Sequence, residues 1–279
     1  MSNVPLIRKA DGELQAFSSE KLANSLRRTG ATDYLIEEIV KDIESWLVEG
    51  TTTRKIYSRA FTLLRRKKRS LAGRYSLKKA IMELGPTGFP FEYFMGHIFQ
   101  SQGLTVETGQ ILQGKCVTHE VDVVATGEKE QHLVECKYYN SQGKYASVQV
   151  PLYIRSRVND LISIREMMPE YEGFVFHGWI ATNTRFTSDA MNYGLCSGLK
   201  LISWDYPNGE SIKAIVEREN LFPITTLTQL TKAEKQQLMS KGIVLCKELK
   251  ENPKLLDFLN LKASKMLSLK EEINDLTDR

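Results

Sequence analysis

"EVDVVATGEKEQHLVECKYYN", residues 120–140, decides how the middle of this chain folds. Its two apolar runs predict two strands, and the polar turn "TGEKEQ" between them predicts a hairpin. Each run nevertheless carries an acid, Asp122 in the first and Glu135 in the second, and Lys137 follows two places later. Because unpaired charge is costly in a buried strand, these residues indicate a functional site.

Alternation along the strands predicts which of these side chains meet. Residues two apart on a strand point to the same side, so Glu135 and Lys137 project together while Cys136 faces away. The hairpin can bring Asp122 alongside Glu135. Two carboxylates in this position suit Mg2+ or Mn2+. Such a site would serve phosphodiester hydrolysis, in which the lysine orients water or neutralises developing charge.

Two other interpretations of this stretch remain open. The charges could form a surface salt-bridge cluster on an edge strand. His119 and His132 lie near the acids and could contribute to a histidine-containing metal cluster, although polar residues at strand ends are the more ordinary explanation. The sequence does not indicate a serine or cysteine nucleophile.

The surrounding pattern alternates helices and strands. Helices are predicted at 91–103, 148–168 and 186–198, and strands at 104–112, 116–126, 131–139, 173–182 and 199–204. This order predicts a mixed α/β fold with a central sheet flanked by helices.

Segments of different character lie on either side of this core. Residues 4–17 predict a hairpin around an Asp-Gly turn, followed by a helical bundle. "GPTGFPFE", at 85–92, breaks helices and predicts a domain boundary. The last part predicts short helices that pack or mediate oligomerisation, or less readily touch DNA backbone. The expected domains are therefore 1–85, 86–217 and 218–279.

Composition limits the protein class. The net charge is +4, but residues 1–85 hold 17 Lys/Arg against 10 Asp/Glu, and they include the run "LRRKKR" at 64–69, more simply a solvated helix face than a phosphate-binding surface. The sequence shows no signal peptide and no apolar run of about 18 residues, so a soluble, cytoplasmic protein without a membrane partner is expected. The four cysteines form no CxxC pair and predict neither a zinc site nor a disulfide framework.

The order "FEYFMGHIFQSQGL", "HEVDVVAT", "HLVECKYYN", "GFVFHGWIATNTRFTSDAMNYG" and "LKLISWD" resembles the Mrr-like branch of the PD-(D/E)xK restriction-endonuclease superfamily, over roughly residues 88–216. The resemblance implies that Asp122 and Glu135 bind the metal and that Lys137 is the catalytic lysine. It also implies that Glu92 is the helical glutamate that binds metal or braces the site. Gln149 falls where some relatives place a glutamine.

"LIRKADGELQAFSSEKLANSL", followed by "GTTTRKIYSRAF" and "LAGRYSLKKAI", resembles the ATP-cone, a nucleotide-binding regulatory module, over about residues 3–85. Cationic side chains around a tight turn and a helix start can hold a triphosphate without hydrolysing it. The resemblance implies that ATP or dATP binds here as an allosteric ligand. The residues implied are Arg8, Lys9, Asp11, Gly12, Lys21, Thr53 and Tyr57.

Together these patterns predict a Mg2+-dependent DNA endonuclease, regulated by ATP or dATP, that acts in restriction, defence or DNA processing as a dimer or higher homo-oligomer. The main alternative is a non-catalytic, nucleotide-sensing DNA-binding regulator or scaffold. An RNA nuclease, or a structural partner of a larger restriction complex, is a third class. Divalent-dependent cleavage separates the first hypothesis from the second.

Overall fold

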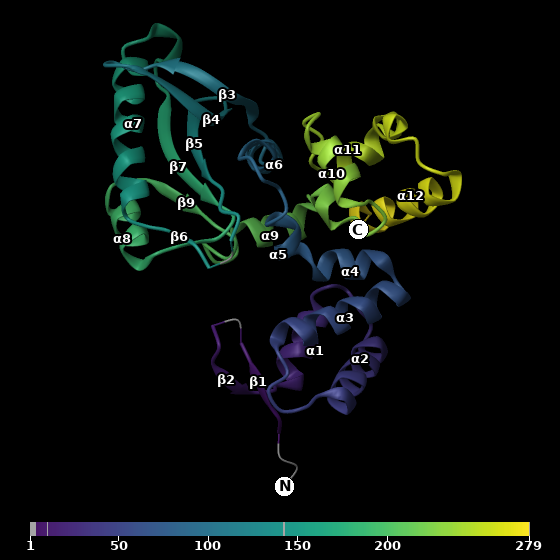
Figure 1. The fold of residues 1–279 in the computed structure, drawn as a ribbon. Helices are drawn as coiled ribbons and strands as arrows, with labels where there is room; N and C mark the ends of the chain where they lie inside the picture. The colour runs from purple at the N-terminus through teal and green to yellow at the C-terminus, as the bar shows by residue number, and fades with distance from the viewer. Residues whose placement is uncertain (1–3, 10, 142, 279) are drawn as a thin grey trace.

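The computed structural model describes residues 4–9, 11–141 and 143–278. Figure 1 shows an N-terminal hairpin with helices, a central sheet with helices, and a helical C-terminal part. The expected α/β class is therefore confirmed. Helices α5 (Leu77–Ile81) and α9 (Ile212–Glu219) lie where the three parts meet.

The N-terminal part begins with the predicted hairpin. Strands β1 (Leu6–Arg8) and β2 (Leu14–Ala16) pair antiparallel, and Gly12 in the turn has a φ of 91°, which glycine adopts without strain. The helices that follow bury one apolar face each, including Leu26, Ile43 and Leu64, in a common cluster. These helices are α1 (Ser19–Arg27), α2 (Asp33–Trp46), α3 (Thr53–Lys67) and α4 (Arg69–Tyr75).

The central sheet has five strands in the order β3-β4-β5-β7-β9. The first three are antiparallel neighbours, as the hairpin prediction requires, and β7 and β9 run parallel to β5. The strands are β3 (Thr105–Gln113), β4 (Thr118–Thr126), β5 (Glu130–Lys137), β7 (Val175–Thr182) and β9 (Lys200–Ile202). The helices beside them are α6 (Phe89–Gln100), α7 (Gln149–Arg165) and α8 (Ser188–Cys196), with a 3-10 turn at Pro169–Tyr171.

Side chains on the two faces of this sheet enter different cores. Val123 and Val134 belong to the largest cluster, which contains α6, whereas Val124 and Leu133 pack against Leu161 of α7. Alternation along each strand therefore buries both faces, as in sheets covered by helices on both sides. The sequence did not predict α9, nor the short parallel pair β6 (Tyr145–Ala146) and β8 (Arg185–Phe186). Two-residue strands are too short to show a period.

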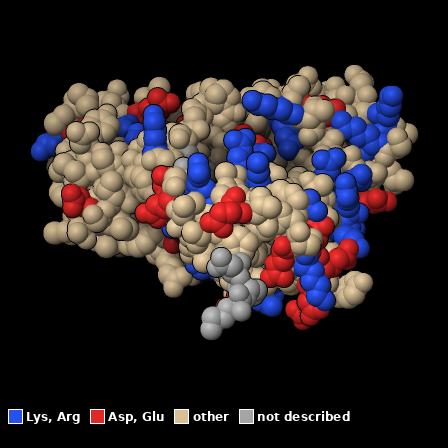
Figure 2. All heavy atoms as spheres, turned by 60° about the horizontal axis from the view of Figure 1, so that its bottom comes forward, with Lys and Arg blue, Asp and Glu red and all other residues tan. Residues whose placement is uncertain are grey.

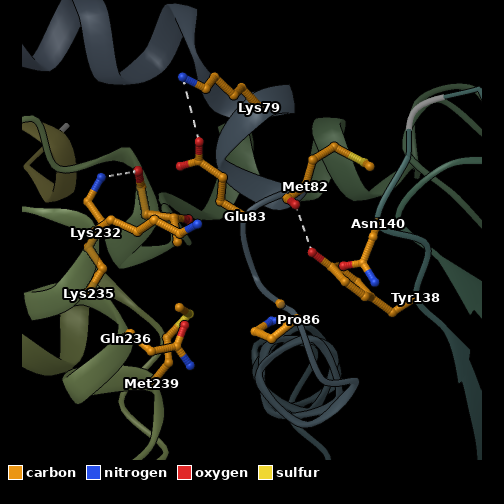
Figure 3. A pocket seen from close by; sticks show the side chains of 12 residues that line it. Lys79, Met82, Glu83, Pro86, Tyr138, Asn140, Lys232, Lys235, Gln236 and Met239 are labelled. Atoms are coloured by element: carbon orange, nitrogen blue, oxygen red, sulfur yellow. Dashed lines mark hydrogen bonds and ion pairs between the residues drawn. The ribbon is translucent and has the colours of Figure 1, made fainter.

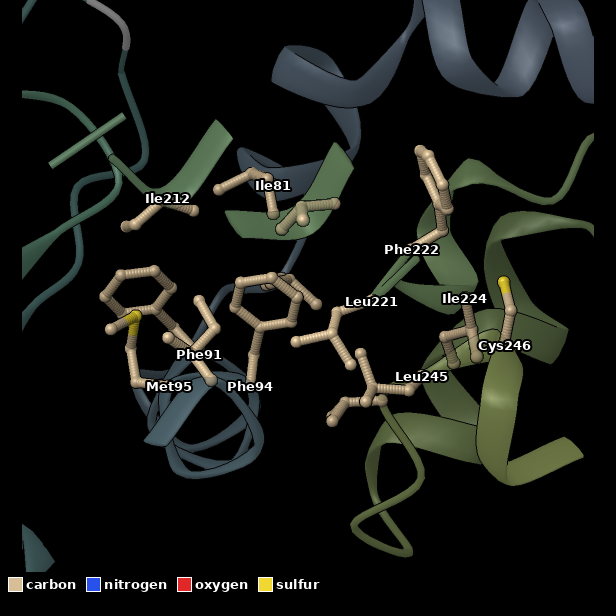
Figure 4. Close-up of a cluster of buried hydrophobic side chains, with 14 of the residues drawn as sticks. Ile81, Phe91, Phe94, Met95, Ile212, Leu221, Phe222, Ile224, Leu245 and Cys246 are labelled. Carbon is tan, nitrogen blue, oxygen red and sulfur yellow. The ribbon is translucent and has the colours of Figure 1, made fainter. Parts of the chain in front are cut away.

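The C-terminal part is helical, as expected, and shares its core with the central sheet domain. Figure 4 shows Phe91 and Phe94 of α6 beside Leu221 and Leu245, and all four side chains are almost fully buried. Burying each such side chain stabilises the fold by roughly 1.5–3 kcal/mol. The segment therefore packs against the sheet domain. The segment contains the 3-10 helices η2 (Ile224–Thr226) and η3 (Pro253–Leu259). Its α-helices are α10 (Lys232–Met239), α11 (Cys246–Glu251) and α12 (Ala263–Thr277).

The same segment also reaches back to the N-terminal helices. Lys68 Nζ lies 2.9 Å from Asp275 Oδ1, and an Nη2 nitrogen of Arg74 donates to the backbone oxygens of Asp275 and Leu276. Leu77 and Ile81 of α5 belong to the large core cluster and not to the N-terminal one. The boundary at residue 85 stays a prediction. None of the helices in the described part of the chain is long and apolar enough to span a membrane.

Candidate active site

The carboxyl end of β5 brings three predicted residues together. The β4–β5 ladder ends at Val123 opposite Val134, and the same register places Asp122 opposite Glu135 at the next position. Beyond the ladder, the backbone N–H of Cys136 donates to Asp122 Oδ2 at 2.6 Å. On the same strand, Lys137 Nζ lies 2.5 Å from Glu135 Oε1. The expected meeting of two acids and a lysine is present in the structure.

Glu135 has a second cationic partner that the sequence analysis missed. Arg157 of α7 donates from Nη1 to Glu135 Oε2 at 2.6 Å, and from Nη2 to the backbone oxygen of Glu120. The side chain of Arg157 is only 16% exposed and that of Glu135 only 12%. Arg157 lies three residues after Ile154 and four before Leu161, both buried. An arginine on the apolar face of a helix was the available signal.

Burial and neighbouring carboxylates raise the pKa values of both Glu92 and Asp122. Burial, and then the carboxylates of Asp122, Glu120 and Glu135, raise the pKa of Glu92 to about 7. Burial, and then Glu135, raise the pKa of Asp122 to about 6, although the Cys136 N–H, Lys137 and Arg157 act in the opposite direction. Glu92 lies in the first turn of α6, where the helix dipole favours an acid. The sequence-predicted Glu92 is therefore electrostatically part of this site.

The oxygen atoms available here fit a hard divalent cation in kind. Among the described residues, neither Asp122 Oδ1 nor the Glu92 carboxylate accepts a hydrogen bond, whereas both oxygens of Glu135 contact cations. Carboxylate oxygens are the donors that Mg2+ and Mn2+ prefer. Asp122 and Glu135, which lie opposite each other in the register, are thus the residues that would hold such an ion, with Glu92 nearby. Among the described residues, however, the ligand atoms of these three carboxylates do not all lie within 4.8 Å of one another.

Gln149 does not join this group. It is the first residue of α7, its side chain is exposed, and it makes no hydrogen bond to a site residue within the described ranges. Its predicted role stays a prediction.

The opposite end of β5 holds a second candidate for a metal ion. Ligand atoms of Glu130, His132 and His177 lie within 4.8 Å of one another, so these residues could hold an ion by distance. Glu130 Oε2 lies 3.2 Å from His132 Nε2 and 3.6 Å from His177 Nε2. His132 is buried within the strand, in contrast to the strand-end location considered from the sequence.

The proton on His132 is placed unfavourably for metal binding. Trp179 Nε1 donates to His132 Nδ1 at 2.9 Å, and an indole nitrogen can only donate. In neutral His132 the proton therefore sits on Nε2, which faces Glu130. A metal-binding histidine has the reverse arrangement, with its second nitrogen donating to an acceptor. As it stands, this cluster is a closed hydrogen-bond network. His119, the other histidine considered, contacts Asp160 Oδ2 at 2.8 Å.

The residues implied in nucleotide binding lie in two places. Arg8 is bonded through its backbone to Thr51, which places the hairpin beside the start of α3 and Thr53. Lys9 pairs with Glu13 at 3.1 Å across the turn that contains Asp11 and Gly12, and Lys21 lies in the first turn of α1. Tyr57 instead stacks on Tyr75, at 5.0 Å between ring centroids, and lines a cavity with Lys79, which precedes the sheet domain, and residues of the C-terminal part.

Comparison with known proteins identifies two parts of the chain. Residues 86–206 match the Mrr-type family described as "Restriction endonuclease", and residues 222–277 match "AF1548-like, C-terminal". Neither match reaches the N-terminal helices. An uncharacterised protein of Archaeoglobus fulgidus is 34% identical over 154 residues, which are 55% of this chain and 82% of that protein.

One solved structure agrees with these matches. The crystal structure of AF1548, a protein of unknown function, is 32% identical with a TM-score of 0.53, and the likeness covers 67% of this chain and 98% of that one. The restriction endonuclease MspJI in complex with a 27-mer oligonucleotide has a TM-score of 0.37 at 13% identity, covering 62% of this chain and 36% of that one, and adds nothing to the assignment. The chain therefore belongs to the AF1548-like family, with a restriction-endonuclease-type domain followed by the AF1548-like C-terminal region.

Proposed function

We propose that this protein is a divalent-metal-dependent DNA endonuclease whose reaction site is the carboxyl end of β5. The observation that carries the proposal is the convergence of Asp122, Glu135 and Lys137, with Glu92 close enough to share their electrostatic field. The match of residues 86–206 to a restriction-endonuclease family supports it independently.

Each residue has a distinct task in this proposal. Asp122 and Glu135, with Glu92 in support, hold Mg2+ or Mn2+, which supplies charge withdrawal from the phosphoryl oxygens and a more acidic water. Lys137 contacts Glu135 and is placed to orient the attacking water or offset charge that develops on phosphate. Arg157 fixes Glu135 from the side of α7. Gln149 stands at the start of that helix, where DNA could be contacted.

Cleavage of supercoiled plasmid tests this proposal directly. Wild-type protein is expected to nick DNA when Mg2+ or Mn2+ is present and not in EDTA. Asp122→Asn and Lys137→Met are expected to be inactive while they remain folded, with a cooperative unfolding transition in EDTA. Parallel mobility-shift and RNA-cleavage assays separate the other classes. Binding of DNA without any nicking would favour a DNA-binding regulator. Preferential cleavage of RNA would identify RNA, and not DNA, as the substrate.

We also propose that ATP or dATP binds the N-terminal part and alters the activity of the nuclease part. The formed hairpin with its Asp11-Gly12 turn, the adjacent start of α3, and Lys21 at the start of α1 support this. Calorimetric titration with each nucleotide, on wild type and on Arg8→Glu, is the test. If neither nucleotide gives a heat of binding, the proposal of nucleotide regulation is wrong, whereas the proposal for the nuclease site is unaffected.

A homodimer would supply the two reaction sites needed to cut both strands of a duplex. Sedimentation of the protein with and without DNA measures this. A monomer in both conditions would limit the expected product to a single-strand nick.

A further inference from the structure

A cavity of about 480 Å³ lies where the three parts of the molecule meet. Figure 3 shows the α10 side chains on one side of the open space and Tyr138 with Asn140 on the other. We call this cavity the junction cleft and define it by Lys79, Tyr138, Lys232 and Lys235. These residues come from α5, from the exit of β5, and from α10 of the C-terminal part.

Positive charge is in excess in the junction cleft. Three ammonium groups line it against one carboxylate, Glu83, which lies 3.6 Å from Lys79 Nζ. Within the described part of the chain, Lys232 and Lys235 have no carboxylate within 4.0 Å; Lys235 Nζ donates to the backbone oxygen of Thr225 at 2.7 Å. Cations that are not neutralised by the protein itself favour an anionic ligand.

A second cavity of about 220 Å³ continues the first, since both are lined by Lys79, Glu83 and Lys235. Tyr57 and Thr228 are among its lining residues, and within the described part of the chain their buried hydroxyl oxygens have no hydrogen-bond partner. Buried polar groups are normally paired, so two unpaired hydroxyls among the residues of one cavity are unusual.

The junction cleft begins one residue from the catalytic lysine. Tyr138 follows Lys137, its ring packs against Phe91, and its hydroxyl donates to the backbone oxygen of Met82 at 2.7 Å. Neighbouring residues on an extended chain point to opposite sides, so the cleft and Lys137 flank the same strand end. In Figure 2, Lys and Arg atoms surround a hollow near the middle of the face shown.

From this arrangement we propose that the junction cleft binds the phosphodiester backbone of DNA beside the cleavage site, with α10 of the AF1548-like region as one wall. This inference rests on the proposed nuclease function and extends it, because it gives the C-terminal region a task in substrate binding. Lysine contacts to phosphates supply affinity without reading sequence. A DNA backbone that passes the carboxyl end of β5 can contact both the junction cleft and Lys137.

DNA binding in a cleavage-deficient background tests the junction cleft. The Lys137→Met protein is titrated with a labelled duplex of about 30 base pairs in Mg2+, and fluorescence anisotropy is followed at several salt concentrations. Adding Lys79→Glu and Lys232→Glu is expected to weaken binding about tenfold or more and to reduce the slope of log K against log salt by about 2, one unit for each lost phosphate contact. Both lysines are exposed, so the fold should tolerate the changes.

The matched control adds Lys254→Glu and Lys270→Glu, which make the same charge change at exposed C-terminal positions that do not line the junction cleft. Binding within about twofold of the background is expected. Equal weakening in both double variants, or in neither, would overturn the cleft proposal while plasmid nicking by wild type left the nuclease proposal intact. Absence of DNA binding in the Lys137→Met background, with no nicking by wild type, would overturn both.

Free nucleotide is the competing source of phosphate. ATP titrated into the same proteins is expected to bind with no difference between the cleft variant and the control. Loss of ATP binding in the Lys79→Glu, Lys232→Glu variant, with DNA binding unchanged, would overturn the proposal in favour of a small-anion site.

Discussion

At each end of strand β5, a glutamate contacts a nitrogen-containing side chain: Glu130 contacts His132, and Glu135 contacts Lys137. The two ends differ in how their protons and charges are paired. At the amino end, Glu130, His132 and Trp179 form a chain of donors and acceptors in which each proton has a partner. At the carboxyl end, burial first and neighbouring carboxylates second raise the pKa values of Glu92 and Asp122. The histidine end thus meets the distance requirement for a metal ion, whereas the carboxyl end is distinguished by carboxylate oxygens that accept no hydrogen bond from the described residues.

The largest expected effect is a difference in nicking rate between variants at the two ends of β5. Glu135→Gln is expected to reduce nicking by about a thousandfold or more, because it removes a carboxylate from the site that would hold the ion. Glu130→Gln, the same chemical change at the other end, is expected to leave the rate within about threefold of wild type. Initial nicking rates in Mg2+ measure both. The reverse order would move the reaction site to the histidine end.

Arg157 should matter less than the acid it holds. Arg157→Ala is expected to lower the nicking rate by about ten- to a hundredfold and to cost about 1–3 kcal/mol of unfolding free energy, because Glu135 loses a mostly buried partner. Arg157→Lys is expected to restore part of the rate. Rates and urea melts are measured on the same preparations. An Arg157→Ala protein with wild-type rate would show that Lys137 alone positions Glu135.

Stability should respond to pH in opposite directions at the two ends. The pKa of Asp122 is raised from 3.8 to about 6, so the stability tied to its protonated form is present below pH 4 and is lost as pH rises through 6. In EDTA, Asp122→Asn should therefore stabilise the protein by about 3 kcal/mol at pH 8 and by less than about 1 kcal/mol at pH 4. Urea unfolding at the two pH values measures the difference. An equal effect at both would exclude the charge explanation.

At the histidine end, stability is expected to change with pH in the opposite direction. Burial lowers the pKa of His132, so the unfolded chain takes up a proton first and stability falls as pH drops below about 6.5. A variant that cannot titrate there, His132→Gln, should lose less stability than wild type between pH 7 and 5. The same unfolding series provides this comparison.

The smallest expected effect concerns Trp179. Trp179→Phe keeps an aromatic ring beside Phe99 and removes the N–H that fixes the tautomer of His132, at a cost of about 1 kcal/mol. Freed Nε2 should then bind Zn2+ about tenfold more tightly than in wild type, with Glu130 and His177. Calorimetry with Zn2+, repeated on a Trp179→Phe, His177→Ala protein, measures it. Tight binding by wild type itself would contradict the tautomer argument.

Local patterns predicted much of this molecule. The hairpin around Asp11-Gly12 and the three successive strands carry signals within a few residues, and the structure contains them. The meeting of Asp122, Glu135 and Lys137 also followed from strand alternation and one turn, since a hairpin fixes its own register. These features depend on contacts between residues close in sequence.

By itself, then, the sequence determined most of the elements and the acid–lysine centre, because alternation and turn chemistry act over short distances. Only the tertiary structure decided which distant groups join them. Arg157 reaches Glu135 from 22 residues away, Trp179 fixes His132 from 47 residues away, and the lysines of α5 and α10 line one cavity. Such meetings depend on how helices pack over the sheet and around α5, and no local period in the chain records that packing.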